Sequence, residues 1–163
     1  MRVKPVWLIA ALVAALSSVS LPLVAQAQSN RFFKSSDLSE VQAFVKTHRK
    51  SVFVFGNGQL TPDFEQSLLE GIKLERSSVR VITSANALPT FSALIKAGAQ
   101  VRYRAGQAVA KNGYSNTVAV FEDRWLLLKR DSEWQLIDSP DSAAQIKTRL
   151  EVFWRYCLPA TAR

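Results

Sequence analysis

The sequence of 163 residues is poor in the residue types from which many catalytic and metal sites are built. It has one cysteine, Cys157, so no disulfide can form within the chain, and one histidine, His48. It has no cluster of metal ligands and no Ser-His pair at a recognisable elbow. The "GNG" at 56–58 lacks the lysine and the spacing of a phosphate-binding loop and indicates a turn. We therefore expect neither a metal ion nor a cofactor.

An unbroken apolar run long enough to cross a bilayer is also missing. The run from Val6 to Leu16 falls short of the roughly 20 residues that a spanning helix needs, and serines and a proline break the apolar pattern after Leu16. Arg2 and Lys4 precede the run, and small residues lead up to Ala27. This pattern predicts a secretory signal peptide over 1–27. We expect export to the periplasm, the cell envelope or the medium, with no membrane span after cleavage.

Acidic residues are outnumbered, with 21 Lys and Arg against 13 Asp and Glu and a formal net charge of +8. Such an excess suits an anionic neighbour, such as phosphate, nucleic acid or an acidic lipid surface. The charges are spread along the chain rather than clustered, so the alternative is that they only keep the protein soluble.

Beyond the signal peptide, strand and helix patterns alternate. Apolar residues at helical spacing predict helices, and short β-branched or aromatic runs predict strands. A capping Thr61 before Pro62 starts the second helix, and Gly98 ends the third. The expected elements are helices at 36–48, from 62 onward, after 89 and at 140–157, and strands at 51–55, 79–83, 99–104, 116–121, 124–129 and 133–137.

This order predicts an α/β fold, a mixed β-sheet flanked by helices and closed by a C-terminal helix. We divide the chain into a signal peptide at 1–27, a polar leader at 28–36, one domain at 37–158 and a tail at 159–163. Cys157 falls on the apolar stripe of the last helix, which indicates a small buried side chain. A homodimer linked through it is the alternative.

Three stretches carry a resemblance to a known family. They are "SVFVFGNGQLTPDFEQSLLEGIKLERSSVRVITSA", "FSALIKAGAQVRYR" and "SNTVAVFEDRWLLLK". In this order they resemble one half of the phospholipase D superfamily, over residues 37–157. The resemblance implies that the strand near residue 116 carries the catalytic motif H-x-K-x-x-x-x-D and runs into a hairpin.

The motif itself is degenerate in this chain, whichever of two registers is chosen. In the first register its three places hold Asn116, Val118 and Asp123, and in the second, shifted by one residue, they hold Ser115, Thr117 and Glu122. Neither register has the histidine or the lysine. The glycine-serine segment that comes next in the family is missing too, and "KRDSEW" stands near its place.

The loss matters because the resemblance implies covalent phosphodiester cleavage. In that chemistry the histidine attacks phosphorus and the lysine neutralises charge on the phosphoryl oxygens. Asparagine cannot replace the nucleophile, and valine or threonine cannot replace the positive charge. His48 is far from the hairpin in the sequence. We therefore expect no catalytic residues and a catalytically inactive domain.

Three cations lie just before the degenerate motif, where the resemblance implies a phosphate pocket: Arg102, Arg104 and Lys111. The two arginines share one face of a strand by its period of two. They are either anion-binding residues or part of an exposed polar face. The leading hypothesis is an exported domain that binds a phospholipid headgroup, a nucleic acid or an envelope partner. The alternatives are a secreted phosphodiesterase or phospholipase with a non-standard site, and a purely structural interaction protein of the envelope.

Overall fold

The structure, a computed structural model, describes residues 30–34, 38–56, 58, 60–104, 117–130 and 133–161. These residues form an eight-stranded mixed sheet in the order β1-β7-β6-β5-β2-β3-β4-β8. Strands β2, β3 and β4 are parallel, and the other neighbours are antiparallel. The strands are β1 (Asn30–Lys34), β2 (Ser51–Gly56), β3 (Ser78–Ser84), β4 (Gln100–Arg104), β5 (Thr117–Phe121), β6 (Trp125–Arg130), β7 (Glu133–Asp138) and β8 (Leu158–Pro159).

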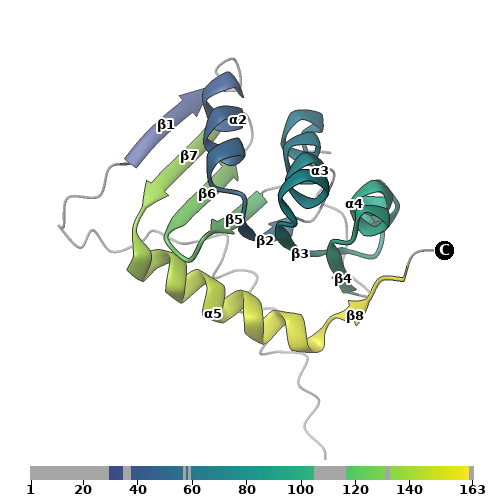
Figure 1. The fold of residues 1–163 in the computed structure, drawn as a ribbon. Coiled ribbons are helices and arrows are strands. Elements are labelled where there is room, and N and C mark those ends of the chain that lie inside the picture. The colour runs from purple at the N-terminus through teal and green to yellow at the C-terminus, as the bar shows by residue number, and fades with distance from the viewer. Residues whose placement is uncertain are drawn as a thin grey trace, which may run out of the picture.

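Helices cover both faces of this sheet. On one face lie α2 (Leu38–Thr47), α3 (Pro62–Glu75), the 3-10 turn η2 (Leu88–Phe91) and α4 (Ser92–Ala97). The helix α5 (Pro140–Tyr156) runs along the other face, and Figure 1 shows it opposite α2, α3 and α4. The expected α/β fold, with a mixed sheet flanked by helices and a C-terminal helix, is confirmed.

Alternation along the strands builds a separate apolar layer on each face of the sheet. On β3, Val79 and Val81 face α2, α3 and α4, whereas Ile82 faces α5. Because neighbouring strands stay in register, residues paired across the ladders point to the same face. Cys157 is buried in the α5 layer, as its place on the apolar stripe indicated, and burial raises the pKa of its thiol.

The sheet extends beyond both ends of the domain expected at 37–158. Strand β1 lies inside the stretch that we interpreted as a polar leader, and it pairs with β7. Strand β8 pairs with β4, and the Ala160 N–H donates to the Val101 carbonyl. Both strands are short and lie at the sheet edges. Their pairing partners are distant in sequence, so local patterns did not reveal them.

The ends of two helices follow the expected chemistry only in part. Gly98 ends α4 with a φ of 106°, in the left-handed region that favours glycine. Thr61 occupies the position before α3 and Pro62 its first turn, but the Thr61 side chain makes no capping hydrogen bond. The Oγ of Ser139 does cap α5, since it accepts from the Ser142 N–H.

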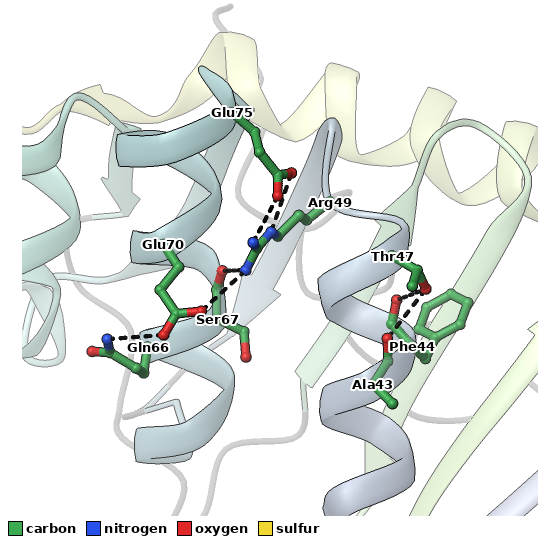
Figure 2. Close-up of polar contacts among 8 residues, drawn as sticks. All are labelled: Ala43, Phe44, Thr47, Arg49, Gln66, Ser67, Glu70 and Glu75. Carbon is green, nitrogen blue, oxygen red and sulfur yellow. Dashed lines mark hydrogen bonds and ion pairs between the residues drawn. The ribbon is translucent and has the colours of Figure 1, made fainter.

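A buried arginine joins the start of β2 to α3. Arg49 donates to the Ser67 carbonyl at 2.9 Å and pairs with Glu75 at 2.7 Å and Glu70 at 3.4 Å, as Figure 2 shows. The arginine passes over Gly71, where an added Cβ would come within 2.8 Å of the Arg49 Cδ. Glycine at this position therefore lets α3 lie close to the sheet.

Candidate functional site at the carboxyl edge of the parallel strands

The three parallel strands end at one edge of the sheet, at Gly56, Ser84 and Arg104. In open α/β sheets, ligands bind in the crevice outside the carboxyl ends of the strands. Strand β5 runs the other way and starts at the same edge, where Thr117 pairs with Gly56. This edge therefore brings Thr117, which lies within the degenerate motif, next to the end of β2 and onto the same edge as the ends of β3 and β4.

A row of three polar residues and one glycine crosses this edge on the face covered by α2, α3 and α4. Lys129 on β6 pairs with Thr117 on β5, and Thr117 pairs with Gly56 on β2. The β2–β3 register pairs Phe55 with Ile82 and so puts Gly56 beside Thr83. We call Lys129, Thr117, Gly56 and Thr83 the polar row. All four are buried.

Burial of these groups carries an energetic cost. Lys129 is only 6% exposed, and burial lowers the pKa of its ammonium group. The ammonium lies 5.8 Å from the centroid of the Trp134 ring. The Thr83 Oγ1 is buried without a hydrogen-bond partner among the described residues. A buried hydroxyl left without any partner costs about 1–3 kcal/mol.

On the opposite face of the same edge, β2, β5 and β6 carry apolar residues, whereas β3 and β4 end in Ser84 and Arg104. Val118, which takes the lysine place of the first motif register, pairs with Leu128 and Phe55 and packs in the α5 layer. Thr117, which takes that place in the second register, lies in the polar row. The structure thus places the lysine positions of the two registers on opposite faces of the sheet, and the position of the second register lies in the row with Lys129 and Thr83.

Arg102 and Arg104 lie on the α5 face, away from the polar row. The Arg102 Nη1 donates to the Trp154 carbonyl at 2.8 Å, and its guanidinium lies 4.7 Å from the centroid of the Trp154 ring. Arg104 is half-buried and pairs with Ser84. Helix α5 covers this face, so it is not the exposed polar face that we considered. Lys111 and Asn116 lie outside the described residues, as does Ser115.

The acidic residue of the motif lies at the far end of β5. Glu122 and Asp123 form the turn of the hairpin, with φ values of 50° and 59°, and the Arg124 N–H donates to the Phe121 carbonyl. Such turns favour residues that tolerate a positive φ. The Asp123 carboxylate also accepts two contacts from Lys147 of α5, at 2.6 and 2.7 Å. This carboxylate holds the turn against α5.

His48 also lies at the far end of β5 from Thr117. Its ring stacks on Phe44 with centroids 4.5 Å apart and lies 5.2 Å from the Trp125 ring, beside the hairpin turn. The Thr47 Oγ1 is 2.8 Å from its Nδ1. His48 and Thr117 lie at opposite ends of β5, and the length of that strand is about 13 Å at the usual rise per residue. The imidazole therefore does not reach the polar row.

Sequence reasoning did not single out Lys129 or Thr83. The one local signal for Lys129 is its position at the end of the apolar run "WLLL", where a polar residue on the core side breaks the pattern. Thr83 has no such signal, because the segment "VRVIT" has the pattern of an ordinary strand. Lys129 and Thr83 lie far apart in the sequence, and only the pairing of the strands places them in one row.

Within the described ranges, no group of three or more His, Cys, Asp or Glu side chains is arranged to hold a metal ion. No helix among the residues that the structure describes has the length and apolar character that crossing a membrane requires.

The sheet order, the helices on both faces and the hairpin after the carboxyl edge together define the phospholipase D-like fold. Among solved structures, the chain is similar to Nuc from Salmonella typhimurium, a phospholipase D family member, with a TM-score of 0.68 and 11% identity over 82% of this chain and 99% of Nuc. It is similar to NucT from Helicobacter pylori, with a TM-score of 0.63 and 13% identity over 82% of this chain and 99% of NucT.

A third similar structure is TrmBL2, an archaeal chromatin protein with a novel mode of DNA binding. It has a TM-score of 0.61 and 9% identity over 94% of this chain and 62% of TrmBL2. No family profile and no curated protein sequence matches the chain. The identities are low, so these similarities concern the fold, and the chemistry of this chain has to be derived from its own residues.

Proposed function

We propose that this protein is an exported, catalytically inactive phospholipase D-like domain that binds a phosphate-containing ligand at the carboxyl edge of its parallel strands. The observation that carries the proposal is the polar row. A buried ammonium and two buried threonines stand at an edge of the sheet where apolar side chains would pack at lower cost. Sites that bind ligands retain such groups at the expense of stability.

The missing nucleophile supports the absence of catalysis. Covalent transfer of a phosphoryl group needs a nucleophilic side chain about 3–3.5 Å from the phosphorus atom. The one histidine of the chain is beside the hairpin turn, at the other end of β5 from the row. Threonine at 117 can donate a hydrogen bond to a phosphate oxygen but brings no charge. These side chains suit binding better than covalent transfer.

Ligand binding is tested by calorimetry and thermal unfolding with inorganic phosphate, a short oligonucleotide and anionic vesicles at two salt concentrations. We expect at least one phosphate-bearing ligand to raise the midpoint of unfolding, because a ligand that binds only the folded state stabilises it. Binding to the oligonucleotide should weaken steeply with salt. No shift and no heat with any of the three ligands would contradict the proposal.

Export is tested by sequencing the amino terminus of the protein recovered outside the cytoplasm. The apolar run and the small residues before Gln28 support cleavage after Ala27. The recovered chain should begin at or very near Gln28. Recovery of an intact chain that starts at Met1 from the membrane fraction would show that the segment is an anchor.

One observation favours the interaction-protein alternative. Val152 and Tyr156 on α5 are 46% and 77% exposed, and Leu158 on β8 is 51% exposed. These apolar side chains follow one another toward the C-terminal end of the helix and the strand after it, a feature that protein-binding surfaces share. A V152S/Y156S variant that loses an envelope partner in crosslinking, but still binds phosphate, would separate the two functions.

A further inference from the structure

Two cationic side chains are buried in the described part of the chain, Arg49 and Lys129. Beside the start of β2, Arg49 forms ion pairs with Glu70 and Glu75 and donates a hydrogen bond to the Ser67 carbonyl. Lys129 lies at the carboxyl edge, in the polar row. A lysine in such a place holds a compact positive charge on a flexible stem, close to the ends of three parallel strands.

The position of Lys129 relative to Thr117 is specific. The two residues face each other across the antiparallel β5–β6 ladder. Directly opposed residues have Cβ atoms about 5 Å apart and project to the same side of the sheet. A side chain from either position therefore enters the same space. Thr117 stands where the second motif register expects a lysine, and the neighbouring strand carries a lysine in its place.

We propose that Lys129 supplies, from β6, the positive charge that position 117 of β5 lacks, and that it binds one phosphoryl group over Gly56 between Thr117 and Thr83. This inference rests on the function proposed above and names its cation and its ligand. A lowered ammonium pKa is consistent with it, because an arriving anion restores the charged form that burial disfavours.

The spacing of the row suits a single tetrahedral oxyanion. Thr117 and Thr83 flank Gly56 on adjacent strands, so two strand spacings separate them, or about 9.6 Å. Glycine has no side chain to fill the gap. Hydroxyl hydrogen bonds of about 2.7 Å on each side would span this separation with one phosphoryl group between the two threonines. The Thr83 Oγ1, unpartnered among the described residues, then gains an acceptor.

The test exchanges the two side chains across the ladder. Titrations by calorimetry with inorganic phosphate, glycerol phosphate and dimethyl phosphate compare wild type, K129T and the double variant T117K/K129T. We expect K129T to lose about tenfold or more in affinity, the size of one charge-assisted contact. The exchanged pair should recover most of that loss, because its lysine enters the same space. The exposed Lys73→Thr on α3 is the matched control and should bind as wild type does.

The outcomes separate this inference from the proposed function. Phosphate binding by wild type that K129T retains in full would overturn the role of Lys129 and leave the ligand elsewhere on the domain. No binding by wild type would overturn both. If K129T does not fold, the near-isosteric Thr83→Val tests the same pocket. It removes only the unpartnered hydroxyl and should weaken binding several-fold, and unchanged binding would contradict the site. The three ligands distinguish free phosphate, a monoester and a diester.

Discussion

Lys129 on β6 and Thr117 on β5 are paired directly across the antiparallel ladder, on the sheet face that α2, α3 and α4 cover. This relationship puts a buried ammonium beside the position at which the second motif register would have its lysine. Lys129 lies on one face of the sheet, and Arg102 and Arg104 lie on the other, the α5 face. The cations on the two faces can therefore be tested independently by substitution.

Arg102 should matter for stability more than Arg104. Its guanidinium donates to the Trp154 carbonyl at 2.8 Å and packs on the Trp154 ring. Loss of that hydrogen bond and that contact in R102A should lower the free energy of unfolding by about 1–2 kcal/mol. R104A should stay within about 0.5 kcal/mol of wild type, because the Arg104 side chain has no hydrogen bond or ion pair with another described residue. Urea unfolding measures both, and equal losses would contradict the difference in their roles.

The contact between Arg49 and Gly71 predicts that α3 tolerates no larger residue at 71. In G71A, the new methyl group would meet the Arg49 Cδ at 2.8 Å and the Ser77 Oγ at 2.9 Å. Despite the higher helix propensity of alanine, we expect a loss of about 1–3 kcal/mol from overpacking. Arg49→Ala should cost about 2–4 kcal/mol, since it removes a buried hydrogen bond to the Ser67 carbonyl and the ion pairs with Glu70 and Glu75. A G71A protein more stable than wild type would show that the arginine moves aside freely.

The Arg124–Asp138 pair predicts a dependence of stability on acid. Arg124 donates to both Asp138 oxygens at 2.8 Å and lowers the pKa of that carboxyl. A carboxyl with a lowered folded pKa stabilises the protein above its unfolded value, about 3.9, and this contribution is lost as pH falls through the folded pKa. The coupling between R124A and D138N should therefore be present at pH 7 and be lost as the pH falls through the folded pKa of Asp138. A coupling that does not change with pH would contradict a charged contact.

Catalysis should be absent. Purified protein should hydrolyse phosphatidylcholine, bis-nitrophenyl phosphate and DNA no faster than a buffer blank, because no nucleophilic histidine lies at the row. His48→Ala provides the decisive control, since the chain has no other histidine. Turnover by wild type that H48A abolishes would show that the enzyme interpretation had been set aside wrongly.

The sequence predicted the alternation of elements well, because strands such as 51–56 and the helix α5 carry their own periodicity. The turn at Glu122 and Asp123 was also readable from local residue preferences. The edge strands β1 and β8 were not, since their only distinguishing feature is a partner far away in sequence. The polar row was invisible for the same reason. Its members come from four strands, and only the register unites Thr83 with Lys129.

The sequence also did not predict what covers the sheet face on which Arg102 lies. A period of two showed correctly that Arg102 and Arg104 share a face. It could not show that α5 returns to cover that face, because the helix lies some fifty residues further along the chain. A helix that is distant in the sequence therefore decides whether a charged side chain on a strand faces solvent or is covered.

The most direct test of the phosphate site is a crystal structure of the full protein with inorganic phosphate bound. We predict the phosphate on the face covered by α2, α3 and α4, over Gly56, with the Lys129 Nζ and the Thr83 Oγ1 within hydrogen-bond distance of its oxygens. A phosphate on the α5 face beside Arg104, with the polar row unchanged, would contradict the proposed site.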